Sequence, residues 1–270
     1  MWIDSLGRRL VTAAILSLAV GCGTTEGTGP SNGPNPGNPG NPGGTGPGVV
    51  AGIVIDAQGA PIAGAKIWVR PALTTGLLEA TTDANGRYSV QGIATIPYRA
   101  YAWTFMNYAG KRLCLRLGSE RAEDYDSFVP TTGVVRNFKL QAEGEIGPNS
   151  GWHFGGELRL FVPFAPAGHR VIVTLTPTGP LIDGSAGSVR SYDAREHDNL
   201  LNSVPVGVYS ASAALVAANG TRTPLTVSTT DQDDYESEVV VRWQTKDSCI
   251  GSHAGGPDRA YLWIRNPAAE

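Results

Sequence analysis

A run of glycine, proline and asparagine between Gly23 and Gly48 constrains the fold of this chain more than any other feature. It holds ten glycines and six prolines in 26 residues, and its repeat Pro36–Gly43 contains no apolar residue to bury. Such a segment cannot build a packed core. We therefore expect a disordered tether, with residues 49–270 left to fold, which is enough for two domains of ordinary size.

The composition of the chain favours β-structure. Charged residues make up only 17% of it, whereas glycine and proline supply 35 and 19 of the 270 residues. This balance argues against long solvated helices and coiled coils. The formal net charge is −3, which provides no attraction for nucleic acid. We expect an all-β protein without a nucleic-acid partner.

Residues 1–21 have the features of a signal peptide. Arg8 and Arg9 precede an apolar run of eleven residues, Leu10–Val20. That run is too short to cross a bilayer, which needs about 20 residues, but it suits the apolar region of a secretory signal. The sequence therefore predicts export from the cytoplasm.

The end of the apolar run, Gly21 followed by Cys22, resembles the lipoprotein box of bacterial lipoproteins. The resemblance implies that Cys22 is lipidated, becomes the mature N-terminus and anchors the protein to a membrane. Residues 22–48 would then be the lipidated cysteine and its tether. By the same resemblance, Gly23 in the position after the cysteine implies a location in the bacterial cell envelope, in the outer membrane and facing the periplasm or the cell surface.

Apolar residues alternate from Val49 onwards and predict two half-buried strands, at Val50–Val54 and at Ala65–Val69. In the turns, Gly59 and Gly86 are expected to adopt a positive φ. Asp83 is expected to form an Asx turn before a hairpin.

The residues around these turns resemble carboxypeptidase regulatory-like domains. The resemblance implies a seven-stranded prealbumin-like β-sandwich over residues 49–143. It does not extend to the zinc peptidase that accompanies this module in metallocarboxypeptidases, because no histidine is followed three residues later by a glutamate. Three groups carry the resemblance: Gly52, Val54, Asp56, Gly59, Pro61, Ile62, Gly64, Ala65 and Ile67; then Thr82, Asp83, Asn85, Gly86 and Tyr88; then Ile96, Pro97 and Tyr101.

Residues 150–267 predict a second β-sandwich. The spacing from Pro205 to Tyr209 repeats that from Pro97 to Tyr101, and each tyrosine is followed by a hairpin and a terminal apolar strand. Either a prealbumin-like or an immunoglobulin-like sandwich fits this pattern. The hairpin turns are expected at Asn107–Gly110 and Asn219–Gly220, and the terminal strands at Val134–Leu140 and Val239–Trp243.

No catalytic set emerges from the sequence. Ser150 and Ser185 lack the flanking glycines of a hydrolase elbow. The acidic run Asp231–Glu238 could hold calcium, but it is more typical of a solvated loop. We expect no enzyme activity, no cofactor and no metal.

Alternation places Trp68 and Arg70 on the outer face of one strand, and Tyr261 and Trp263 on that of another. An exposed tryptophan beside hydrogen-bonding groups can stack on a sugar ring, although on a β-sandwich such a residue more often covers a neighbouring strand or domain. Our hypothesis is a non-enzymatic surface lipoprotein whose β-sandwich modules bind polysaccharide or an envelope protein. The alternative is a structural or accessory component of a cell-envelope assembly, with no small ligand.

Cys114 and Cys249 remain once Cys22 is lipidated. In an oxidising compartment an even pair of cysteines tends to be bridged. We expect a disulfide between Cys114 and Cys249 that joins the two domains, the alternative being two separate thiols.

Overall fold

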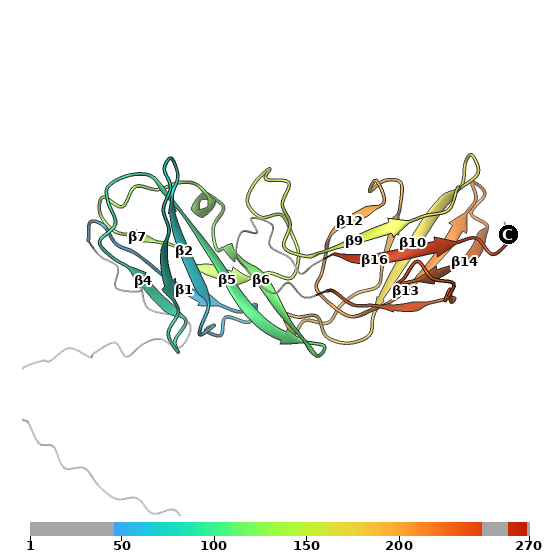
Figure 1. Cartoon of the computed structure of the whole chain (residues 1–270), viewed down its shortest axis with the longest axis horizontal. Coiled ribbons are helices and arrows are strands. Elements are labelled where there is room, and N and C mark those ends of the chain that lie inside the picture. Colours follow the sequence, from blue (N-terminus) through green and yellow to red (C-terminus); the bar gives the residue numbers. More distant parts are fainter. Residues whose placement is uncertain (1–45, 245–258, 269–270) are drawn as a thin grey trace, which may run out of the picture. The chain divides into compact units, whose positions relative to one another are not determined.

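The computed structural model describes residues 46–244 and 259–268, which form an all-β structure (Figure 1). The strands belong to two eight-stranded sheets, each folded into a sandwich. This confirms the predicted fold class of two tandem β-sandwiches. The predicted signal peptide, Cys22, most of the tether and Cys249 lie outside the described residues.

The first sandwich has the strand order β3-β2-β5-β6-β8-β1-β4, with β7 beside β1. Strand β1 runs parallel to β7 and β8, and the other neighbours are antiparallel. A 3-10 helix, η1 (Ala122–Tyr125), follows β6. The strands are β1 (Val50–Ile55), β2 (Lys66–Pro71), β3 (Leu78–Thr81), β4 (Arg87–Val90), β5 (Tyr98–Tyr108), β6 (Lys111–Ser119), β7 (Val134–Val135) and β8 (Phe138–Leu140).

The second sandwich has the order β11-β10-β13-β14-β16-β9-β12, with β15 beside β13. Counted from its own first strand, this order repeats that of the first sandwich, with β16 in the place of β8. The two sandwiches therefore share the order of seven strands and differ in the neighbour of the remaining one, β7 or β15. The strands are β9 (Gly156–Phe161), β10 (Arg170–Pro177), β11 (Arg190–Asp193), β12 (Leu200–Val204), β13 (Tyr209–Val216), β14 (Arg222–Ser228), β15 (Val239–Val241) and β16 (Ala260–Arg265).

The strand register corrects one predicted equivalence. Pro71 pairs with Tyr98 in the first sandwich, and Pro177 pairs with Tyr209 in the second. Tyr98, rather than Tyr101, is therefore the counterpart of Tyr209, and both of these tyrosines are buried. The proline-to-tyrosine spacing was misleading because it counts loop residues, whereas strand pairing decides which face a side chain occupies.

The predicted terminal strands also differ from those observed. The segment Val134–Leu140 divides into β7 and β8. In the second sandwich, Val239–Val241 pairs with β13, so the counterpart of β8 is β16. An apolar run alone does not reveal which neighbour a short strand will pair with.

Turn residues of the regulatory-like motifs behave as their chemistry predicts. Gly59 and Gly86 have φ values of 90° and 69°. The Asp83 carboxylate accepts hydrogen bonds of 2.8 Å from the backbone N–H groups of Asn85 and Arg87, which is the expected Asx turn. The hairpin after β5 turns through Ala109, whose φ is 49°, within the predicted segment.

Gly52, in the middle of β1, is required by a close approach. A Cβ atom at this position would overlap the backbone oxygen of Arg136. The same oxygen accepts a hydrogen bond of 2.6 Å from the Tyr88 hydroxyl. The glycine thus allows the segment before β8 to lie directly against β1.

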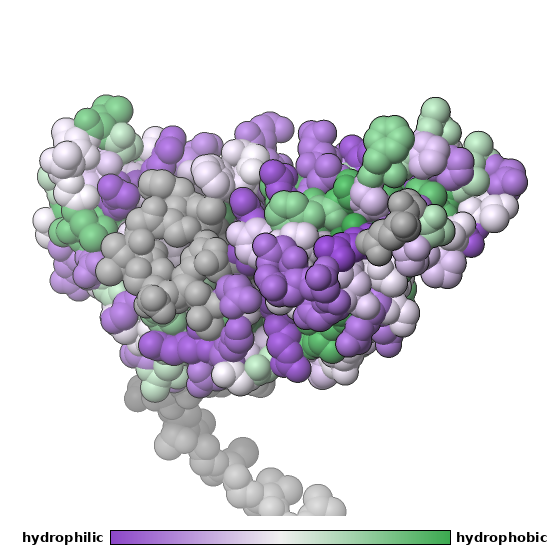
Figure 2. Space-filling model, turned by 45° about the vertical axis from the view of Figure 1, so that its right-hand side comes forward, coloured by the Kyte–Doolittle hydropathy of each residue, from purple (hydrophilic) through white to green (hydrophobic). Residues whose placement is uncertain are grey.

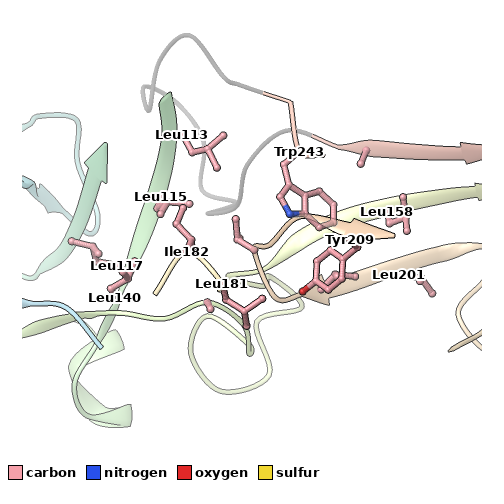
Figure 3. Close-up of a cluster of buried hydrophobic side chains, with 14 of the residues drawn as sticks. Leu113, Leu115, Leu117, Leu140, Leu158, Leu181, Ile182, Leu201, Tyr209 and Trp243 are labelled. Atoms are coloured by element: carbon pink, nitrogen blue, oxygen red, sulfur yellow. The ribbon is translucent and has the colours of Figure 1, made fainter. Parts of the chain in front are cut away.

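Inward-facing residues of the strands form the core. On β2, Ile67 and Val69 are fully buried. Figure 3 shows part of the buried set, with Leu115 and Leu117 of β6 and Tyr209 of β13 among its members. In the described part of the chain, no helix is long and apolar enough to cross a membrane.

Candidate functional site

The outward residues of β2, β5 and β6 form an aromatic surface with a cation at its centre. We call Trp68, Tyr101, Trp103 and Arg116 the outer aromatic face. The ring centroid of Trp103 lies 4.6 Å from that of Trp68 and 6.0 Å from that of Tyr101. The Arg116 guanidinium lies 4.5 Å from the Tyr101 centroid and 4.6 Å from that of Trp103, within range of cation–π attraction to both.

Arg116 is a buried cation. Its exposed fraction is 4%, and its Nε and Nη1 atoms have no hydrogen-bond partner among the described residues. Burial lowers the pKa of Arg116 to about 10, a change that the nearby phenols of Tyr101 and Tyr125 oppose. The side chain therefore stays charged at neutral pH. Buried charges are normally paired or hydrogen-bonded, whereas two of the three nitrogens of this guanidinium have no partner among the described residues.

A pocket of about 330 Å³ opens beside this guanidinium. Strands β5 and β6 form one side of it, and the end of η1 and the segment that leads to β9 form the other sides. The residues that line it are Arg99, Tyr101, Arg116, Tyr125, Asp126, Ile146, Gly147, Pro148, Ser150 and Trp152.

Local contacts hold the walls of the pocket in place. The backbone N–H of Ser119 donates a hydrogen bond of 3.1 Å to the Tyr125 hydroxyl. The N–H of Ile146 donates one of 2.7 Å to the Trp152 carbonyl, which closes a hairpin-like turn. Gly147 has a φ of 76° and lies so close to the Tyr125 ring that a Cβ atom would approach within 3.0 Å of it. The pocket is therefore preformed.

The lining residues give the pocket a small positive charge and an aromatic wall. Arg99 and Arg116 contribute two positive charges and Asp126 one negative charge, a net charge of +1. Tyr125 and Trp152 add aromatic surface, and the Trp152 side chain is half exposed.

A second aromatic surface lies on the second sandwich. Phe161 of β9 and Trp263 of β16 are cross-strand partners whose rings stack at 4.7 Å with an angle of 12°. Tyr261 lies beside them, with its centroid 5.7 Å from that of Trp263. Phe161 and Tyr261 are 43% and 41% exposed. We call these three residues the stacked triad.

The four residues proposed from strand alternation divide between the two surfaces. Trp68 is half-buried and packs on Trp103, while Arg70 is exposed opposite Arg99, and neither lines the pocket. Tyr261 and Trp263 both belong to the stacked triad. On the face shown in Figure 2, hydrophobic residues appear in separate groups among hydrophilic ones.

Sequence reasoning missed Phe161, Arg116 and the pocket. Alternation from Leu158 and Leu160 would have placed Phe161 outward, and alternation from Leu115 and Leu117 would have done so for Arg116. The pocket has no comparable signal, because it needs the end of η1 and the segment before β9 to meet on the sheet.

Acidic side chains of the run Asp231–Glu238 bond to other side chains of the second sandwich. Asp234 accepts hydrogen bonds from the hydroxyls of Ser228 and Thr230, at 2.7 and 2.8 Å, and these bonds lower its pKa. Asp233 pairs with Arg265 at 2.8 Å. Among the described residues, no group of three histidine, cysteine or acidic side chains is placed to hold a metal ion.

Cys114 lies in β6 between Leu113 and Leu115 and is buried against Trp103. Its predicted partner, Cys249, lies outside the described residues. The Cys114–Cys249 bridge stays a prediction.

Comparison with known families identifies the module in the first sandwich. Residues 49–113 match the family model of the carboxypeptidase regulatory-like domain. The first sandwich therefore contains this domain, as its glycine and aspartate turns predicted. A search of curated protein sequences finds no match.

Solved structures give weaker likenesses. The Bacillus anthracis TIE protein matches 82% of this chain and 34% of its own at 11% identity, with a TM-score of 0.27. BcpA, the major pilin subunit of Bacillus cereus, matches 82% of this chain and 85% of its own at 13% identity and a TM-score of 0.24. A DUF3823 family protein from Bacteroides ovatus matches 72% and 97% at 9% identity and a TM-score of 0.23. The chain spans about a third of the TIE protein, and TM-scores of this size carry no functional argument.

Proposed function

We propose that the protein is a non-enzymatic lipoprotein of the bacterial cell surface whose β-sandwich modules bind carbohydrate. The stacked triad, Phe161, Tyr261 and Trp263, is the observation that carries this proposal. Its rings stand on neighbouring parallel strands, so they keep a fixed spacing on a rigid sheet.

The triad has the geometry that stacking on sugar rings requires. The apolar face of a pyranose packs on an aromatic ring, and a rigid side chain loses little conformational entropy when it does so. Phe161 and Tyr261 leave more than a third of their surface open. Arg159 lies opposite Tyr261 on β9 and provides a hydrogen-bond donor for sugar hydroxyls.

The anchoring half of the proposal rests on the sequence. The lipoprotein box ending at Cys22 and the tether up to Gly48 support attachment to a membrane, with the sandwiches held away from the lipid surface. We infer location in the outer membrane from Gly23, the residue after Cys22, through the resemblance to bacterial lipoproteins. The carboxypeptidase regulatory-like module at residues 49–113 supports a role without catalysis, because this module accompanies catalytic domains and is separate from them.

Affinity electrophoresis of residues 22–270 in gels containing soluble polysaccharides tests the binding half. Retention by at least one polysaccharide is expected, and Tyr261→Ala should weaken it about tenfold, since stacking on an aromatic ring contributes on the order of 1 kcal/mol or more. Phe164→Ala is the matched control. It removes an aromatic residue that is 90% exposed and lies outside the triad, so retention should not change.

Two outcomes would contradict the proposal. Equal loss of retention in the Tyr261→Ala and Phe164→Ala variants would show that the triad is not the binding surface. An absence of retention by every polysaccharide would favour the alternative, a structural or accessory component of an envelope assembly in which the triad is covered by a neighbouring protein.

A further inference from the structure

We propose that the pocket beside Arg116 binds the carboxylate of an acidic sugar, a hexuronate residue. The inference deepens the proposed function by giving the first sandwich a saccharide site of its own, apart from the stacked triad of the second sandwich. Residues of the pocket, not of the triad, would provide its specificity.

The guanidinium of Arg116 is the group that would bind the carboxylate. It is 4% exposed, and two of its three nitrogens, Nε and Nη1, have no hydrogen-bond partner in the described part of the chain. Tyr101 and Trp103 fix the plane of the guanidinium by stacking, at 4.5 and 4.6 Å. A guanidinium held in this way keeps N–H donors without acceptors in the described part of the chain, and a carboxylate is an acceptor for such donors.

The net charge of the pocket selects a monoanion. Arg99 and Arg116 exceed Asp126 by one positive charge, which a carboxylate neutralises. A phosphate monoester would bring a charge of about −1.5 to −2 and would be repelled by Asp126. The Asp126 carboxylate is instead an acceptor for the hydroxyl donors that a sugar carries beside its acid group.

The walls of the pocket suit the remainder of a sugar. A volume of about 330 Å³ is at the lower end of the range of ligand pockets, roughly 300 to 1,000 Å³, and fits one ring-sized residue. The Tyr125 and Trp152 rings supply apolar surface for stacking. Trp152 is 50% exposed, so the pocket is open to solvent and a polymer can enter it with its chain continuing outward.

Isothermal titration calorimetry with residues 22–270 and D-galacturonate tests the assignment. D-galactose, acetate and inorganic phosphate serve as comparison probes. We expect galacturonate to bind more tightly than all three, because only it combines the carboxylate with a hydroxylated ring. Trisaccharides of galacturonate should bind at least as well as the monosaccharide.

Arg116→Met tests the role of the guanidinium, since it keeps the unbranched apolar stem and removes the charge. Affinity for galacturonate should fall by roughly ten- to a hundredfold, the usual effect of losing a charged hydrogen-bond donor. Arg112→Met is the matched control. Arg112 stands on the same face of β6 and stacks on Phe105 at 4.0 Å, but it does not line the pocket.

The assignment would be overturned if the wild-type protein bound galactose, acetate or phosphate as tightly as galacturonate, or bound none of them. It would also be overturned if Arg112→Met weakened galacturonate binding as much as Arg116→Met. Tyr261→Ala separates the two proposals, because it should weaken retention through the stacked triad about tenfold and leave galacturonate affinity unchanged.

Discussion

Replacing Arg116 by methionine should make the unliganded protein more stable, which is an unusual expectation for a buried residue. The reason is that the guanidinium has been removed from water without gaining an anionic partner among the described residues. Methionine fills a similar linear volume and carries no charge to desolvate.

The size of the effect follows from two opposing contributions. Burial lowers the pKa of Arg116 from 12.5 to about 10, and at roughly 1.4 kcal/mol per pH unit this corresponds to about 3 kcal/mol of disfavoured charge. Stacking on Tyr101 and Trp103 returns about 1 kcal/mol per ring. The difference is a gain of about 1 kcal/mol for Arg116→Met, or a rise of about 2 to 4 °C in the unfolding midpoint for a chain of this size.

Thermal unfolding followed by far-ultraviolet circular dichroism measures this gain. Arg112→Met is again the control, because it removes an exposed guanidinium from Phe105 and should lower the midpoint slightly or leave it unchanged. Saturating galacturonate should raise the midpoint of the wild type, by about 2.7 kcal/mol of added stability at a concentration of 100 Kd, and should leave that of Arg116→Met nearly unchanged.

A clear loss of stability in unliganded Arg116→Met would refute the reasoning. It would mean that the interactions of the guanidinium within the protein stabilise the fold by more than the free-energy cost of its desolvation. The buried charge would then give no reason to expect an anion in the pocket. The same substitution would then be a structural lesion, and its effect on galacturonate binding could not be assigned to a lost contact.

Three further predictions concern other parts of the chain. Gly52→Ala should destabilise the first sandwich by about 3 kcal/mol or more, seen in thermal unfolding, whereas Gly179→Ala, which has open space around it, should have little effect; equal midpoints would contradict this. Cys22→Ser should abolish incorporation of labelled fatty acid and release the protein from membranes, and unchanged labelling would disprove lipidation. The bridge between Cys114 and Cys249 predicts no alkylatable thiol in mass spectra of the non-reduced mature protein, and two alkylated cysteines would exclude it.

The strands that could be predicted from the sequence are those in which burial follows a strict alternation. In β2 the inward Ile67 and Val69 stand on either side of Trp68, and in β16 the inward Leu262 and Ile264 stand on either side of Trp263. A period of two residues fixes the face of every side chain once one is known to be inside. Turn residues such as Asp83 were equally readable because their chemistry acts over four residues or fewer.

The sequence predicted that the two sandwiches resemble each other, but it did not predict which residues of their strands correspond. The second sandwich repeats the strand order of the first, although its terminal strand, β16, follows β15 only after a long intervening segment. Sequence spacing measures distance along the chain, whereas topology depends on which strands pair. The similarity of Pro97–Tyr101 to Pro205–Tyr209 was therefore real as a motif and wrong as an alignment.

The sequence could not predict the pocket, because the residues that line it come from segments far apart along the chain. In β6, Arg116 follows an alternation that places it outward, and an outward arginine is ordinarily solvated and exposed. It is buried here because Tyr101 and Trp103 from β5 enclose it on one side, while Tyr125 and Trp152, from segments that no local pattern connects, stand around the space beside it. No local sequence pattern predicts a cation that the tertiary structure buries without an ion-pair partner. We relate the burial of Arg116 to the proposed ligand because such a buried charge does not stabilise the fold.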